Sequence, residues 1–329
     1  MRFRTLTLVG ILALGLLAEP LTADAQEPGK AYRIGWLGAS TFHNSTLFGP
    51  FSRAMRALGW DSQDFFIEHR WASGDSTRFP DFASELVHLE PDVIVAVSAQ
   101  ATRAAMSATE TTPIVFTMVV DPVGAGFVAS LSRPGRNATG VTNVSRELRA
   151  KQLELLKQVV PGLARVAVLW NSAAPDMPGE WRAMQAAASA SGVELEALEV
   201  RGPDDLEPAL NAAPRKGAGA LIVLWDPLTY IYAKKITDLA TKNRLPAMYL
   251  DERFVGLGNA GFISYGPDAV ELAKLAAAQV DKILKGGNPA DLAVEQNAKF
   301  ELIIDLRTAR ALGLSVPRSL LLQANRVIE

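Results

Sequence analysis

Cysteine is absent from this chain of 329 residues. Its absence excludes disulfide bonds, cysteine metal ligands, thiol nucleophiles and attachment of a lipid to a cysteine. Histidine is almost as scarce, because the chain has only His43, His69 and His88. A histidine-based metal site would need most of these three together with carboxylates, and the sequence has no HExxH, GxSxG or Walker motif. We therefore expect no metal, no cofactor and no catalytic residues.

Neither sign of charge predominates. The chain has 33 lysine and arginine residues against 35 aspartate and glutamate residues, which gives a formal net charge of −2. The two signs are mixed along the chain, whereas a nucleic-acid-binding surface needs a basic cluster. Hydrophobic residues make up 49% of the chain, as expected for a well-packed globular protein. We expect no nucleic-acid partner.

Long apolar runs are also missing, and the one apolar run of note lies near the N-terminus. It covers residues 6–18, follows Arg2 and Arg4, and precedes Ala23-Asp24-Ala25. A basic start, a short apolar stretch and small residues at a cleavage site are typical of a secretory signal peptide. A membrane-spanning helix would need about 20 apolar residues. We predict a signal peptide over 1–25, cleaved after Ala25, and export to the periplasm without membrane insertion.

The length of the chain favours two domains, because a single hydrophobic core rarely grows beyond about 250 to 300 residues. Short apolar runs alternate with amphipathic stretches, which is typical of parallel sheets covered by helices. In the first half the predicted strands are 33–39, 65–71, 92–97 and 113–118, and the predicted helices are 47–58, 78–89 and 99–109. The second half repeats this order, with strands 165–171, 193–200, 219–225 and 246–250, and helices 180–191, 204–213 (capped by Asp204) and 229–242.

Three stretches predict crossings between these halves. They are the Gly- and Pro-rich segment 133–140, the short strand 262–266, and residues 292–295. A helix over about 267–284 is expected between the last two, with Pro267 in its first turn. The predicted fold class is α/β, with two doubly wound parallel-sheet lobes joined by a multi-crossing hinge. Lobe 1 would comprise 26–141 plus about 267–293, and lobe 2 would comprise 142–266 plus about 294–329.

Small residues, most of them polar, follow the predicted strands. Ligands of open parallel sheets bind beyond the carboxyl ends of the strands. The candidate ligand-binding residues are therefore Ser40, Thr41, Ser98, Ala99, Gln100, Asp121, Asn171 and Asp226. Because Ser, Asn and Asp are also preferred helix caps, capping is the alternative role for each of them.

The charges of the solute follow from the same positions. A helix that begins near 98–101 presents free N–H groups and a positive dipole end, which favour a carboxylate. An ammonium group would need a counter-charge, for which Asp121, Asp226 and Asp251 are candidates. A zwitterionic solute such as an amino acid satisfies both requirements.

Aromatic residues at or near the strand ends are candidates for an apolar part of the site. Tyr249 and Tyr265 are in this set, as is Trp225, and packing in the core is their alternative role.

The segment 124–129 reads Gly-Ala-Gly-Phe-Val-Ala, which matches the glycine fingerprint of dinucleotide-binding folds. It follows the fourth predicted strand rather than the first, so we interpret its glycines as a turn.

Several longer blocks of the sequence are similar to one known family. They are residues 113–116, 121–126, 131–141, 264–268, 280–286, 300–302 and 311–314. Through these blocks the chain resembles the ABC-transporter substrate-binding proteins, in the group that includes tryptophan- and tyrosine-type binding proteins. The resemblance implies a type I periplasmic binding fold, a ligand held between two lobes joined by three crossings, and delivery to a permease and its ATPase.

The resemblance also adds Thr142 and Asn143, on a crossing, to the expected ligand-binding residues. Residues 41–44 replace the His-Pro-containing segment of the aromatic-amino-acid members, so the resemblance does not specify the solute. We expect the periplasmic solute-binding component of an ABC importer, a monomer that closes over a small polar or zwitterionic, preferably amino-acid-like, solute. The alternatives are a periplasmic ligand sensor subunit for a receptor and an exported two-domain α/β enzyme.

Overall fold

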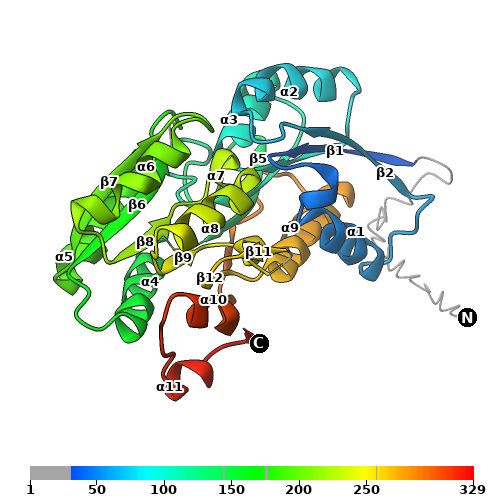
Figure 1. Ribbon diagram of the computed structural model, residues 1–329. Helices are drawn as coiled ribbons and strands as arrows, with labels where there is room; N and C mark the ends of the chain where they lie inside the picture. Colours follow the sequence, from blue (N-terminus) through cyan, green and yellow to red (C-terminus); the bar gives the residue numbers. More distant parts are fainter. Residues whose placement is uncertain (1–30, 144, 175–176, 257) are drawn as a thin grey trace, which may run out of the picture. The chain divides into compact units, whose positions relative to one another are not determined.

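The computed structural model describes residues 31–143, 145–174, 177–256 and 258–329 (Figure 1). The predicted signal peptide and its cleavage site lie outside the described residues. Within the described ranges, no helix combines the length and the apolar character that crossing a membrane requires. Nor does any group of three or more histidine, aspartate or glutamate side chains in these ranges have an arrangement that could hold a metal ion.

A six-stranded parallel sheet contains the first four strands of the chain. Its strand order is β13-β5-β4-β3-β1-β2, and each neighbouring pair is parallel. The bounds are β1 Tyr32–Gly38, β2 Phe65–Trp71, β3 Val93–Val97, β4 Ile114–Val119, β5 Ala138–Asn143 and β13 Glu295–Asn297. The central strand β3 is apolar throughout and buried on both faces, as expected for a parallel sheet covered by helices.

Helices cover both faces of this sheet (Figure 1). The helices α1 (Phe48–Ala57) and α9 (Ala269–Leu284) lie side by side on one face, and α2 (Phe79–His88) and α3 (Ala99–Ala108) on the other. Alternation along the strands produces the two cores, because Val93 and Val95 pack toward α1 and α9 while Ile94 and Ala96 pack toward α2 and α3. We call this sheet with its four helices the six-stranded unit.

A second sheet has seven strands in the order β15-β14-β12-β9-β8-β6-β7. The bounds are β6 Arg165–Asn171, β7 Glu194–Val200, β8 Ala220–Val223, β9 Ala247–Tyr249, β12 Ile263–Pro267, β14 Phe300–Asp305 and β15 Arg326–Ile328. All pairs are parallel except β12 with β14, which is antiparallel. The sheet is therefore mixed at one end rather than wholly parallel.

Helices cover this second sheet as well. The helices α4 (Ser145–Val159) and α5 (Met177–Ser191) share a core with one face, and α6 (Leu206–Ala212) and α8 (Ala233–Lys242) share a core with the other. We call this sheet with its helices the seven-stranded unit. Its remaining elements are η3 Pro214–Lys216, α7 Pro227–Ile231, η4 Glu252–Phe254, β10 Val255–Gly256, β11 Asn259–Ala260, α10 Leu306–Ala311 and α11 Arg318–Leu321.

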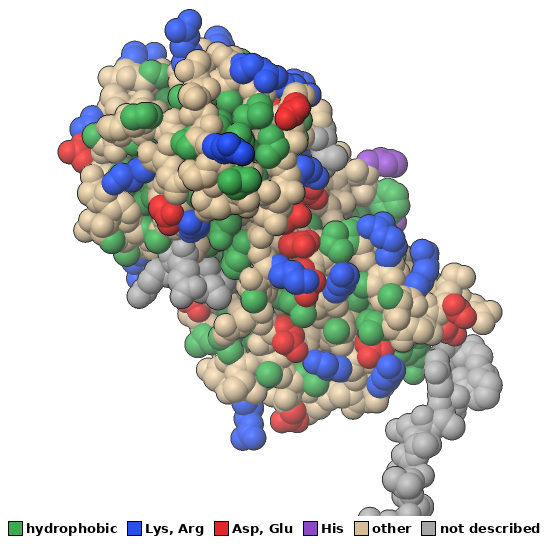
Figure 2. All heavy atoms as spheres, turned by 90° about the horizontal axis from the view of Figure 1, so that it is seen from below, with side chains coloured by type: hydrophobic (Ala, Val, Ile, Leu, Met, Phe, Trp, Pro, Cys, Tyr) green, Lys and Arg blue, Asp and Glu red, His purple; other side chains and the backbone are tan. Residues whose placement is uncertain are grey.

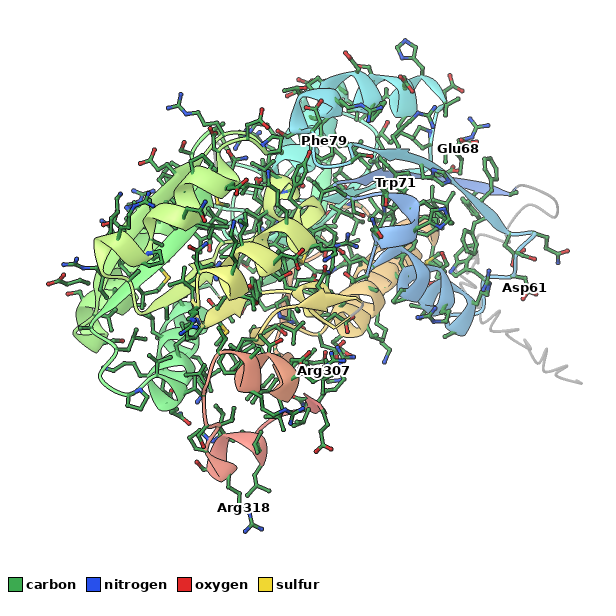
Figure 3. The ribbon with its side chains drawn as sticks, in the orientation of Figure 1. Asp61, Glu68, Trp71, Phe79, Arg307 and Arg318 are labelled. Atoms are coloured by element: carbon green, nitrogen blue, oxygen red, sulfur yellow. The ribbon has the colours of Figure 1, made fainter. Side chains whose placement is uncertain are left out.

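Short 3-10 helices complete the six-stranded unit. They are η1 Phe42–Asn44, after β1, and η2 Ser76–Arg78, between β2 and α2. Trp71 ends β2 and Phe79 begins α2, close to each other at this edge of the unit (Figure 3). Acidic and basic side chains are interspersed on the face seen in Figure 2, in keeping with the mixed charges of the sequence.

The chain passes between the two units at three places: after β5, between β12 and α9, and between β13 and β14. The class of fold is the predicted one. The lobe boundaries near residues 141, 266 and 293 stay a prediction, because a lobe is defined by its motion as a rigid body.

Several local expectations differ from the structure. Helix α4 had no predicted counterpart, and the predicted helix 229–242 is divided at Tyr232 into α7 and α8. Asp204 does not cap α6, since Asp205 is its N-cap residue and makes no side-chain capping bond. Pro267 ends β12 instead of opening α9, and the Asp268 carboxylate caps that helix by accepting from two backbone N–H groups.

Candidate functional site

A small cavity of about 20 Å³ lies between the two units, where strand ends and helix N-termini meet. From the six-stranded unit it is lined by Ala39, Ser40, Ser45, Thr46, Leu47, Val97, Met118, Ala269 and Leu272. From the other unit it is lined by Trp225, Tyr230, Asp251 and Pro267. The residues come from the carboxyl ends of β1, β3, β4, β8, β9 and β12 and from the first turns of α1 and α9, which is the expected position of a ligand site in open α/β sheets.

Met118 enters the cavity wall because strand β4 is irregular there. The register of β4 on β5 shifts between Phe116 and Val119, and Met118 has a φ of 57°. A non-glycine residue in this left-handed region costs about 1–3 kcal/mol and is found where the surrounding structure imposes it. The Thr142 hydroxyl donates to the carbonyl oxygens of Val119 and Val120, both at 2.8 Å, and so holds the strand end that follows Met118.

Asp251 supplies a carboxylate to the cavity. It follows β9 and caps η4, accepting a hydrogen bond of 2.8 Å from the backbone N–H of Arg253. Burial raises the pKa of Asp251 to about 6, and the negative charge of Glu252 adds to this effect. The Arg253 backbone and side chain and the Thr46 hydroxyl act in the opposite direction. The Asp251 carboxylate has no ion-pair partner within 4.0 Å among the described residues.

Arg253 does not neutralise that carboxylate directly, because its guanidinium group is engaged elsewhere. Its Nη1 donates to the carbonyl of Asn44 at 3.2 Å and its Nε donates to the carbonyl of Tyr230 at 3.3 Å. The group also lies over the Tyr230 ring, 5.0 Å from the centroid. The cationic residue next to Asp251 in sequence therefore bridges the two units.

Two aromatic residues, Tyr230 and Trp225, line the cavity. The Tyr230 hydroxyl donates to the Asn44 carbonyl at 2.8 Å and lies 3.4 Å from the Thr46 hydroxyl. Burial raises the pKa of Tyr230, with the charge of Asp251 as a further cause. The Nε1 of Trp225 is buried and has no hydrogen-bond partner among the described residues. A buried donor without an acceptor is unfavourable, and Trp225 is one of the residues that line the cavity.

Asp226 forms a separate polar cluster with Gln100 and Asn171. Gln100 Nε2 donates to Asp226 Oδ2 at 2.8 Å, while Asn171 Nδ2 and the Leu228 N–H donate to Oδ1 at 3.0 and 2.8 Å. Burial raises the pKa of Asp226, and these three donors oppose the rise. Since Gln100 belongs to the six-stranded unit and Asp226 to the other, this cluster joins the two units and occupies both carboxylate oxygens.

Other predicted site residues lie around the cavity without forming its wall. Ser98 is fully buried and caps α3, its hydroxyl accepting from the Ala101 N–H at 3.2 Å. Its φ of 116° is also in the left-handed region. Thr41 is half-buried and precedes η1. Of the predicted residues, Ser40, Trp225 and Asp251 are in the cavity wall.

Ala99 and Asp121 lie along an open groove of about 700 Å³ instead. Arg103 and Arg182 line the same groove. Asp121 is exposed and accepts from the Gly124 N–H at 2.7 Å, which supports the interpretation of the glycine motif as a turn. The groove is much larger than the cavity, is lined by residues of both units and has charges of both signs.

The remaining predicted residues are further from the cavity. Tyr249 is 1% exposed and stacks on Phe254 in the core, with ring centroids 4.7 Å apart. Tyr265 stacks on Phe300 at 5.8 Å. Asn143 ends β5, where its backbone pairs with Asn297, and its side chain is outside the described part.

A larger open hollow of about 730 Å³ lies near α10 and β15. Its arginines, of which Arg307 is labelled in Figure 3, are already paired. Arg307 pairs with Asp305 at 2.7 Å and Arg326 with Glu252 at 2.9 Å. Because β14 is antiparallel to β12, the end of β14 at Asp305 lies opposite the carboxyl ends of the parallel strands. The described lining of this hollow has neither an unpaired carboxylate nor a buried donor without a partner.

Sequence reasoning missed Thr46, Met118 and Tyr230. None of them directly follows a strand: Thr46 lies beyond η1, Tyr230 is inside α7, and Met118 lies within β4. The pairing irregularity that exposes Met118 to the cavity has no signature in its apolar strand sequence. For Thr46 and Tyr230 the useful signal would have been their nearness in space, which depends on how the two units meet.

Comparison with known proteins agrees with this architecture. Residues 46–328 match the family of ABC transporter substrate binding proteins. A tyrosine-binding protein of Clostridioides difficile (strain R20291) is 26% identical over 269 residues, which is 80% of this chain and 75% of that protein.

Two solved structures extend the comparison. An ABC domain in complex with L-Trp from Streptococcus pneumoniae superposes with a TM-score of 0.84 at 22% identity, covering 91% of this chain and all of the other. The ligand-free, open structure of a substrate binding protein from Clostridium difficile has a TM-score of 0.66 at 24% identity, over 91% and 99% of the two chains. The family is one of binding proteins, as expected, and not of enzymes. This chain belongs to the ABC transporter substrate binding protein family.

Proposed function

We propose that this protein is the periplasmic solute-binding component of an ABC importer and that it binds an amino acid between its two lobes. The observation that carries the proposal is the small cavity at the converging strand ends. Its lining includes Asp251, whose carboxylate has no ion-pair partner among the described residues, and Trp225, whose buried Nε1 has no hydrogen-bond partner among them. An amino acid has the complementary groups, an ammonium and a carboxylate. The tyrosine-binding relative and the L-Trp complex support an amino acid as the solute.

In this proposal the structure corresponds to a closed conformation. A cavity of about 20 Å³ accommodates about one water molecule, whereas small-molecule pockets are usually 300–1,000 Å³. An amino acid therefore enters only if the lobes separate or the cavity walls move. The higher TM-score with the L-Trp complex than with the open, ligand-free protein supports this assignment.

The hydrogen bonds between the two units would hold the closed state. They include Tyr230 to Asn44 and Gln100 to Asp226, and opening would expose these groups to water. Because the net energy of such bonds is only about 0.5–1.5 kcal/mol each, opening remains accessible. Solute binding would then shift the population toward a closed form whose cavity walls have moved to hold the solute, and a permease would recognise that form.

The proposed location and partners follow from the sequence. A signal peptide over residues 1–25 would direct the chain to the periplasm, where it would deliver the solute to a permease that works with a cytoplasmic ATPase. We propose a monomer, since closure of the lobes must stay unobstructed.

The proposal is tested by thermal unfolding of the mature chain from Gln26 in the presence of amino acids, sugars, short peptides and purines. A ligand that binds the native state raises the unfolding temperature in proportion to the logarithm of its concentration. We expect a dose-dependent rise with amino acids, which are recovered unchanged. A rise confined to another chemical class, or consumption of the ligand, would contradict the proposal.

A further inference from the structure

The structure separates the three carboxylates that the sequence offers as partners for an ammonium group. Asp121 is exposed and lines the open groove outside the cavity. Asp226 is 1% exposed, and three donors already occupy its two oxygens. Asp251 alone among these three lines the small cavity.

The surroundings of Asp251 lack a compensating cation. The cavity lining contains no lysine, arginine or histidine, and the Arg253 guanidinium group binds the carbonyls of Asn44 and Tyr230 instead. The other titratable groups nearby are Tyr230 and Glu252, and η1 also carries the exposed His43. A partly buried carboxylate without a counter-ion is unfavourable, and a cationic guest would relieve this cost.

The other residues of the cavity lining indicate which further groups a cationic solute would need. Leu47, Val97, Met118 and Leu272 provide apolar contacts, and the unpaired Trp225 Nε1 requires an acceptor. A guest that suits all three features has a positive group, an apolar portion and an acceptor oxygen. The site thus selects against solutes whose only charge is negative.

We propose that Asp251 binds the ammonium group of the solute and that this ion pair is the principal determinant of its selectivity. The proposal rests on the proposed amino-acid-binding function and deepens it by assigning the charge recognition to one residue. Asp226 then acts as a connector between the units, and its carboxylate does not contact the solute.

The test measures the binding of an amino acid and of its ammonium-free analogue to the wild type, to one variant and to a control variant. The first ligand is a common L-amino acid that binds the wild-type protein. The second is the carboxylic acid that has hydrogen in place of the ammonium group of that amino acid. The proteins are the wild type and Asp251→Asn, in which the amide oxygen can still accept from the Arg253 N–H. Asp121→Asn is the matched control, because it makes the same change at an exposed carboxylate that also accepts a backbone N–H.

Removing one member of a buried charge pair weakens binding by about 30-fold or more. In titration calorimetry we expect the wild type and Asp121→Asn to prefer the amino acid over its ammonium-free analogue by at least this factor. In Asp251→Asn the preference should fall below about threefold, through weaker binding of the amino acid. Circular dichroism and thermal unfolding of each variant confirm that it is folded.

The outcomes distinguish this inference from the function on which it rests. If no amino acid binds the wild type, the proposed function is contradicted. If amino acids bind but the folded Asp251→Asn protein keeps the wild-type preference for the ammonium group, the assignment of Asp251 alone is overturned. Equal loss of affinity for both ligands would also overturn it, since that pattern reflects disturbed closure and not charge recognition.

Discussion

The Tyr230 hydroxyl donates a hydrogen bond of 2.8 Å to the backbone carbonyl of Asn44. Tyr230 lies in α7 of the seven-stranded unit and Asn44 lies at the end of η1 in the six-stranded unit. The same carbonyl accepts from Arg253 at 3.2 Å. One backbone oxygen thus receives two donors from the opposite unit, directly beside the cavity.

Replacing Tyr230 by phenylalanine should favour the open state. The substitution removes the hydroxyl and keeps the ring that contacts Trp225, with centroids 5.9 Å apart. Loss of one hydrogen bond of this kind should weaken solute binding by about 2–10-fold and increase the radius of gyration of the ligand-free protein in small-angle scattering. Tyr232→Phe, two residues further along the chain and not part of the cavity lining, is the control and should change neither quantity. Unchanged affinity in Tyr230→Phe would contradict a role of this bond in closure.

Replacing Asp226 by alanine should lower stability. The change leaves the amides of Gln100 and Asn171 and the N–H of Leu228 without their acceptor. Buried groups left unsatisfied cost about 1–3 kcal/mol each, offset in part by the removal of a buried carboxylate. We expect a loss of about 2 kcal/mol in the free energy of unfolding, measured by urea denaturation at pH 7. A variant as stable as the wild type would show that the cluster makes no net contribution.

Solute affinity should fall at acidic pH. The ionised form of Asp251 binds an ammonium group, and its pKa in the ligand-free protein is about 6. Affinity should therefore be full at neutral pH and decrease as the pH falls through 6, by about tenfold for each unit below it. Calorimetric titrations at pH 5 and pH 7 measure this difference. The ammonium-free analogue makes no such ion pair and is repelled by the ionised Asp251, so it should bind at pH 5 at least as tightly as at pH 7. A decline for both ligands would point to a different titrating group.

The ligand-free Asp251→Asn protein should be more stable than the wild type at pH 7. The folded-state pKa of Asp251 is raised from 3.8 to about 6, so the folded state holds its proton more tightly than the unfolded state. This contribution to stability is present below about pH 4 and is lost as the pH rises through 6, by at most about 3 kcal/mol. Asparagine has no such penalty. Thermal unfolding at pH 4 and pH 7 should show a stability gain at the higher pH only, and a loss there would contradict the unpaired state of the carboxylate.

The sequence predicted the elements whose patterns are local. Apolar runs such as the one at β3 mark strands buried on both faces, and their positions agree with the structure within one or two residues. Helix α4 was missed because its sequence is strongly polar, with eight charged or amide side chains between Ser145 and Val159. The antiparallel direction of β14 was also not predicted, since direction depends on tertiary connections that no local pattern encodes.

The site was predictable only in part, because it too depends on contacts between residues that are distant in the sequence. The rule that ligands bind beyond strand ends led to Ser40, Gln100, Asn171 and Asp226, which lie in or beside the cavity. It gave no means of ranking Asp226 below Asp251, because the occupancy of the Asp226 oxygens results from residues 55 and 126 positions away. Tyr230 and Thr46 contact each other across 184 positions, and such a contact becomes evident only after the two units are placed together.

The most direct test of the account is calorimetric titration of the mature protein with the common L-amino acids at pH 7. The account predicts saturable binding of one or a few amino acids with a stoichiometry of one per chain, and loss of that binding in Asp251→Asn. The absence of binding for every amino acid, with a folded protein, would contradict the central claim that the cavity between the two sheets receives an amino acid.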